Sequence, residues 1–114
     1  MPIGSSPSSI TTYVDLAAAS ANQTIVAAPG ANLAIWVTNI HIQAAAAGTL
    51  RLHDSTPTNL SGTISLAATG GFAREASNPD LPLYKCAANT AFQATTVGAG
   101  ATMDGSVGYI VVRA

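Results

Sequence analysis

Residues 33–43, with the sequence Leu-Ala-Ile-Trp-Val-Thr-Asn-Ile-His-Ile-Gln, decide the fold of this chain. β-Branched and aromatic residues dominate the segment, and they favour a strand over a helix. A regular strand places alternate residues on opposite faces. One face then holds Trp36, Thr38, Ile40 and Ile42, and the other holds Ile35, Val37, Asn39, His41 and Gln43. The segment is apolar on both faces at its start and polar on one face at its end, so we expect a strand that runs from a buried centre to a rim.

Shorter segments with the same alternation recur on both sides of this strand, separated by Gly, Pro and Asn. Further strands are expected at residues 10–16, 24–28, 49–53, 63–67, 83–86, 91–96 and 106–113. About eight short antiparallel strands with no helical pattern predict an all-β fold. We therefore expect one domain at residues 10–114, built as a β-sandwich or a jelly-roll-like barrel.

The sequence predicts the structure of two connections between strands in more detail. The run of small residues at 44–48 is expected to turn residues 33–43 back onto 49–53 as a hairpin, with Leu50 and Leu52 inward and Arg51 and His53 outward. Residues 72–82 hold charges and two prolines, and proline is excluded from central strands. We expect a surface loop there.

Charge is scarce along the whole chain. Charged side chains are 8% of the residues, against about 25% in an ordinary domain. The net charge is −1 and no basic stripe exists, so neither a nucleic-acid nor a membrane partner is expected. A neutral surface of small residues is cheap to desolvate. This composition predicts a chain that packs against other copies of itself or against a larger assembly, with its sheet edges occupied there.

The first nine residues are uncharged and rich in Ser, Pro and Gly, which is typical of an extended arm. Such an arm is either a free terminus or a segment that adds a strand to a neighbouring subunit. On the second reading, the candidate partner-binding residues are Met1, Pro2, Ile3, Gly4, Ser5, Ser6, Pro7, Ser8 and Ser9. The segment has neither the basic nor the apolar region of a secretory signal.

Residues with catalytic or metal-binding chemistry are few. His41 and His53 are expected on the outward face of the hairpin beside Asp54, but the spacing supplies no third ligand and favours plain surface histidines. The single Cys86 excludes an intrachain disulfide and reads as a small, half-buried apolar residue. Trp36 is expected in the core. We therefore expect no enzyme activity, no cofactor, no metal and no small-molecule substrate.

Three sequence motifs follow one another in the second half of the chain. They are "NLSGTISLAATGGF" at 59–72, "NPDLPLYKCAANTAFQATT" at 78–96 and "GSVGYIVV" at 105–112. The order resembles that of small all-β virion proteins of tailed bacteriophages, which decorate or cement the capsid. The matching positions are Leu60, Gly62, Ile64, Leu66, Gly70, Asn78, Pro79, Ala88, Phe92, Gly105, Val107 and Tyr109.

The resemblance implies a non-enzymatic structural protein on the capsid surface of a virion, assembled in the host cytoplasm. It also implies a homo-oligomer, with a trimer favoured, that clamps neighbouring subunits of the major capsid protein. Two alternatives stay open. One is a tail, neck or head-fibre component with the same fold. The other is a carbohydrate-binding attachment module, which would need an exposed aromatic platform from Trp36 or a tyrosine.

Overall fold

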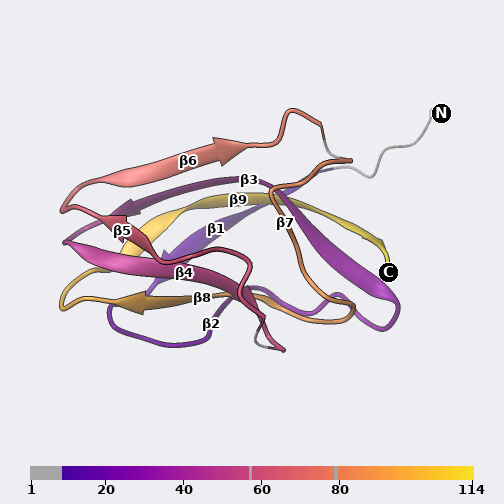
Figure 1. Ribbon diagram of the computed structural model, residues 1–114, viewed down its shortest axis with the longest axis horizontal. Coiled ribbons are helices and arrows are strands. Elements are labelled where there is room, and N and C mark those ends of the chain that lie inside the picture. Colours follow the sequence, from indigo (N-terminus) through magenta and orange to yellow (C-terminus); the bar gives the residue numbers. More distant parts are fainter. Residues whose placement is uncertain (1–8, 57, 79) are drawn as a thin grey trace.

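The computed structural model describes residues 9–56, 58–78 and 80–114 and shows nine strands and no helix in them (Figure 1). The strands are β1 (Ile10–Leu16), β2 (Gln23–Val26), β3 (Leu33–Ala44), β4 (Gly48–Asp54), β5 (Ile64–Leu66), β6 (Gly71–Glu75), β7 (Tyr84–Lys85), β8 (Phe92–Val97) and β9 (Met103–Arg113). The prediction of an all-β fold is confirmed.

The strands form two antiparallel sheets that pack as a sandwich (Figure 1). One sheet has the order β1-β9-β3-β6, with β7 also paired to β3, and the other has the order β2-β8-β4-β5. The two sheets stay separate and do not close into one barrel. Most pairs join segments that lie far apart in the sequence, such as β1 with β9 and β2 with β8.

The core lies between the inner faces of the two sheets. Phe92 stacks on Tyr84 with ring centroids 6.4 Å apart. The larger apolar side chains buried there are Val14, Leu16, Val26, Ile35, Val37, Ile40, Ile42, Leu50, Leu52, Leu66, Phe92, Met103 and Val107. Because aromatic residues are few, aliphatic side chains from both sheets supply most of the buried area, as the composition predicts.

A β-bulge interrupts the alternation of β3. Val37 pairs with Tyr109 and faces the core, but the next paired residues are Asn39 and Gly108, which leaves Thr38 unpaired in the ladder to β9. A bulge inserts one residue and shifts the faces of everything beyond it. The predicted face of Trp36, Thr38, Ile40 and Ile42 is therefore wrong: Ile40 and Ile42 are in the core, and Trp36 is on the opposite side of the sheet.

The predicted hairpin between residues 33–43 and 49–53 is also wrong. β3 belongs to the five-stranded sheet and β4 to the four-stranded sheet, and β4 pairs with β5 and β8. The short connection crosses between the sheets, where the amide of Ala45 donates to the carbonyl of Thr102 at 2.9 Å. The inward direction of Leu50 and Leu52 is confirmed, since both are fully buried.

The expected loop at residues 72–82 contains a strand instead. β6 pairs with β3 from Asn39↔Glu75 to Gln43↔Gly71. An edge strand needs hydrogen bonds on one side only and tolerates charged residues, so Arg74 and Glu75 do not prevent pairing. The described residues between β6 and β7, 76–78 and 80–83, form the loop.

Candidate interaction surface

The structure places one of the nine predicted partner-binding residues. Ser9 is exposed and directly precedes β1. Met1, Pro2, Ile3, Gly4, Ser5, Ser6, Pro7 and Ser8 lie outside the described residues. The interaction surface of the described chain is therefore sought on the outer faces and edges of its two sheets, where "outer" means facing away from the opposite sheet.

The two histidines do not come together. His41 is exposed on the outer face of the five-stranded sheet, whereas His53 lies on β4 of the other sheet and is 2% exposed. The predicted surface position is confirmed for His41 and wrong for His53. The His53 ring makes hydrogen-bond contacts of 2.9 Å with the carbonyl of Asp54 and the hydroxyl of Thr95, so it joins two strands. Among the described residues, no group of three or more His, Cys, Asp or Glu side chains lies close enough to hold a metal ion.

Asp54 and Cys86 are buried at one end of the core. Burial by itself raises the pKa of the Asp54 carboxyl, but hydrogen bonds from Thr56, Thr58 and Ala87 outweigh burial and hold the pKa below its ordinary value. Oδ1 accepts from the amides of Thr56 and Thr58 at 2.9 Å, and Oδ2 accepts from the amide of Ala87 at 3.2 Å. The carboxylate thus ties two loops to the end of β4.

The environment of Cys86 disfavours ionisation of its thiol. Burial and the nearby negative charge of Asp54 raise its pKa to about 12. A thiol must ionise to act as a nucleophile or as a metal ligand. Cys86 belongs to the core cluster, in agreement with its predicted apolar role, and is more deeply buried than predicted.

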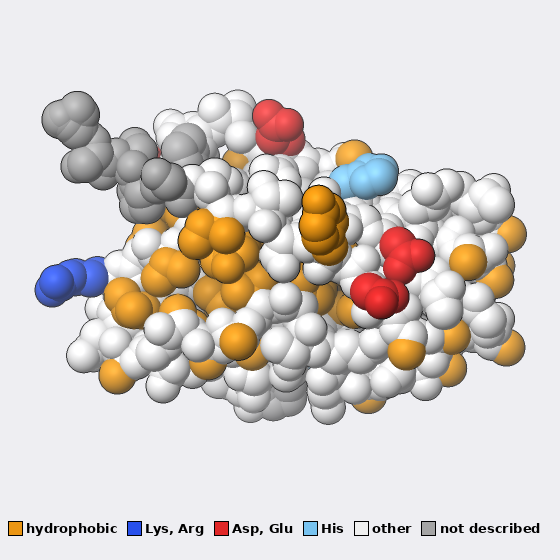
Figure 2. All heavy atoms as spheres, turned by 180° about the vertical axis from the view of Figure 1, so that it is seen from behind, with side chains coloured by type: hydrophobic (Ala, Val, Ile, Leu, Met, Phe, Trp, Pro, Cys, Tyr) orange, Lys and Arg blue, Asp and Glu red, His pale blue; other side chains and the backbone are white. Residues whose placement is uncertain are grey.

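The outer face of the five-stranded sheet divides into a polar and an apolar part. Cross-strand pairing places Tyr13, Ser106, His41 and Ala73 in one row and Asp15, Asp104, Gln43 and Gly71 in the next. Trp36 and Ile110 pair at the opposite end. In Figure 2, acidic side chains and a histidine gather toward one end of this face, and apolar side chains gather toward the other.

Tyr13 is the residue of this face that sequence reasoning missed. Its side chain is 87% exposed, the largest exposure among the large hydrophobic residues described. The signal was present, because the alternation of Ile10, Thr12, Val14 and Leu16 toward the core directs Tyr13 outward.

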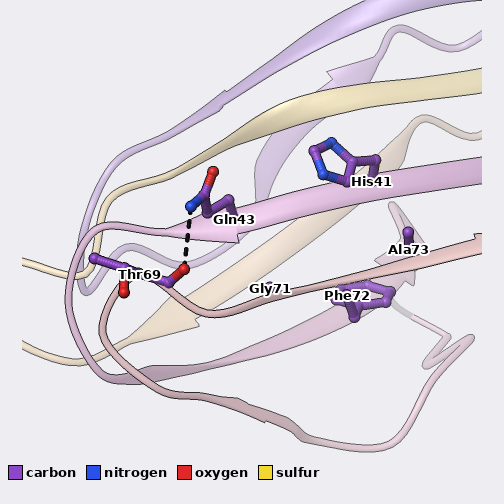
Figure 3. Close-up of a pocket in the computed structure, with 6 residues that line it drawn as sticks. All are labelled: His41, Gln43, Thr69, Gly71, Phe72 and Ala73. Atoms are coloured by element: carbon purple, nitrogen blue, oxygen red, sulfur yellow. Dashed lines mark hydrogen bonds between the residues drawn. The ribbon is translucent and has the colours of Figure 1, made fainter.

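A shallow depression lies between β3 and β6 beside the polar part of this face (Figure 3). It has a volume of about 330 Å³ and is lined by His41, Gln43, Thr69, Gly71, Phe72 and Ala73. The amide of Gln43 already donates to the carbonyl of Thr69 at 3.1 Å. The depression holds one titratable side chain, His41, and no hydrogen bond from His41 to the hydroxyl of Thr69 is present to activate that hydroxyl as a nucleophile.

The outer face of the four-stranded sheet is nearly neutral. Arg51 is its single charged residue among the described residues of its strands. The remaining outward side chains are Thr24, Thr49, Ser65, Gln93, Thr95 and Val97, with His53 covered. Several are already satisfied within the face, as where the Gln93 amide donates to the Thr24 hydroxyl at 3.2 Å. A partner that covers such a surface has to desolvate only one charged side chain, Arg51.

No family model, curated protein sequence or solved structure matches this chain. Among the described residues, no helix is long and apolar enough to cross a bilayer.

Proposed function

We propose that this chain is a structural virion protein that binds the outside of a phage capsid and cements the shell by bridging subunits of the major capsid protein. The supporting observation is the near absence of charge on the outer face of the four-stranded sheet. The resemblance in motif order supplies the virion context. In this role the chain has no enzyme activity and acts as a homo-oligomer, for which the resemblance implies three copies.

The neutral outer face suits a permanent contact with another protein. Burying a charge costs several kcal/mol unless the charge is paired. When a partner covers this face, only Arg51 incurs that desolvation cost. Its hydroxyl and amide groups are short and held on a sheet, so little side-chain entropy is lost on binding. We place the capsid contact on this face and expect an interface of the standard size, about 800 Å² per partner.

Binding to empty capsids that lack the protein tests this proposal. The purified chain should co-sediment with such capsids at high copy number and raise the temperature at which the shells disrupt. Val97→Lys should weaken binding, because Val97 is 59% exposed on the proposed contact face. His41→Lys is the matched control, since His41 is exposed on the opposite face.

Two results would overturn the proposal. If the chain fails to bind shells but is found at one end of intact particles, it is a tail or neck component. If His41→Lys abolishes binding and Val97→Lys does not, the contact lies on the other sheet.

Carbohydrate binding is a second candidate, favoured by the exposure of Tyr13. An exposed ring can stack on the apolar face of a sugar, and the carboxylates of Asp15 and Asp104 with the amide of Gln43 lie in the adjacent row. Titration with host cell-wall polysaccharide tests it. Tyr13→Ala should abolish sugar binding while capsid binding is kept. Equal polysaccharide binding by the variant and the native chain would exclude this site.

A further inference from the structure

The edge strands of the two sheets differ in how they are protected. On the five-stranded sheet, β6 and β7 carry Arg74, Glu75 and Lys85, and charged residues on an edge discourage pairing with another chain. On the four-stranded sheet, β2 and β5 are uncharged but have only four and three residues. Short edges are also poor templates. Among the described strands, protection is therefore present at three of the four sheet edges.

β1 is the exception. Its seven residues pair with β9 without interruption from Ile10↔Tyr109 to Leu16↔Met103 and pair with no other described strand. Asp15 is its single charged residue. In an antiparallel ladder, every second residue directs its N–H and C=O groups away from the neighbour already bound. β1 therefore presents a long, regular row of backbone donors and acceptors.

We infer that β1 pairs with β1 of a second copy of this chain, antiparallel and about a twofold axis at Tyr13. The five-stranded sheets of the two copies then join into one continuous sheet. This contact is isologous, so the same surface serves both copies. It concerns the chain free in solution, is a different contact from the trimer that the resemblance implies for the virion, and does not depend on the capsid proposal.

The side chains of β1 are self-complementary in this register. On the outer face, Tyr13 meets Tyr13 of the second copy, and Thr11 meets Asp15. On the inner face, Ile10 meets Leu16 of the second copy, and Thr12 meets Val14. The exposed side chains of Ile10 and Tyr13, 45% and 87% accessible, each gain an apolar or aromatic neighbour.

The register is also selected by charge. Centring the pair on Asp15 would place two carboxylates directly opposite each other, which is destabilising. Centring it on Tyr13 uses all seven residues of β1 and faces each carboxylate with a hydroxyl. About six to eight main-chain hydrogen bonds would form. Because a strand pair is smaller than a standard interface, we expect a reversible dimer rather than a permanent one.

Sedimentation velocity over a wide concentration range tests the pair. The native chain should show a monomer–dimer equilibrium. Thr11→Lys should tighten the dimer about threefold to tenfold by adding two symmetric ion pairs with Asp15, and Thr11→Asp should weaken it similarly. His41→Lys is the control on the same outer face away from the edge, and it should leave the equilibrium unchanged. Deletion of residues 1–9 should leave it unchanged too.

Disulfide trapping then tests the register. Tyr13→Cys should cross-link readily under mild oxidation, because residue 13 faces itself across the axis. The buried Cys86 contributes little background. His41→Cys should cross-link slowly. The inference is overturned if the chain stays monomeric, if both cysteine variants cross-link equally, or if deletion of residues 1–9 abolishes the dimer, since the arm would then be what occupies the edge.

Discussion

The ammonium group of Lys85 lies 4.5 Å from the centroid of the Trp36 ring, on the outer side of the five-stranded sheet. The two residues are paired across β7 and β3. A cation over an aromatic face is attracted by the ring quadrupole. The only tryptophan of the chain, which the alternation of β3 directs away from the core, is thus covered by a partner on a two-residue strand.

Removing this cation should loosen β7. We expect Lys85→Ala to lower the free energy of unfolding by about 0.5–1 kcal/mol, the usual value of an exposed cation–π contact. Trp36 fluorescence reports the change directly, with increased quenching by acrylamide. Lys85→Arg should restore the native quenching. If acrylamide quenches Trp36 fluorescence equally in Lys85→Ala and in the native chain, Lys85 does not shield the ring from solvent.

The predictable and unpredictable parts of this fold differ in their physical origin. β1 has one solvated face, so its alternation marks the bounds Ile10–Leu16 as they are found. No local feature of composition or segment length marks the bulge at Thr38. The bulge is defined by the pairing of β3 with β9, which lies far along the chain. The sequence therefore predicts β3 but assigns Trp36 to the wrong face.

Choice of partner strand is likewise non-local. The small residues at 44–48 are equally compatible with a tight hairpin and with a crossing between sheets, and pairing with β9 decides between them. The candidate surface was predictable in part. Low charge indicates a neutral contact face, but which sheet carries it depends on which residues the two sheets turn outward.

Asp54 makes the free energy of unfolding depend on pH in the acid range. Its folded pKa lies below the unfolded value of about 3.8, so the carboxylate contributes stability above that value and loses it as pH falls through the folded pKa. We expect Asp54→Asn to cost about 2–3 kcal/mol at pH 7, because the hydrogen bonds from Thr56 and Thr58 lose their charged acceptor and the amide of Ala87 loses its acceptor oxygen. Denaturant unfolding at several pH values measures both effects.

The control for Asp54 is Asp104→Asn, which changes an exposed carboxylate. It should leave stability at pH 7 within about 0.5 kcal/mol of the native value. Below about pH 4 the native chain should lose stability more steeply than Asp54→Asn. Parallel pH profiles for those two proteins would mean that the Asp54 carboxylate is not held by its hydrogen bonds.

Cys86 should resist thiol reagents in the folded chain. With its pKa raised to about 12, the thiolate fraction at pH 8 is about one in ten thousand, against about one in ten for a thiol of pKa 9.0. Burial slows the reaction further. A disulfide reagent should therefore label the native protein at the rate of unfolding and label the denatured protein at once. Rapid labelling without unfolding would contradict the buried position.

Gly105 should tolerate no side chain, because it packs against the backbone of β3. A methyl group placed there would collide with the carbonyl of His41 and press on the Cα of Ile42, atoms of the central strand that cannot move without breaking its ladder. We expect Gly105→Ala to lower the free energy of unfolding by about 2 kcal/mol, as overpacking commonly does. Gly62→Ala is the matched control: a methyl group there meets open space, so stability should change by less than about 0.5 kcal/mol. Equal stability of the two variants in denaturant unfolding would show that β3 and β9 are not packed this closely.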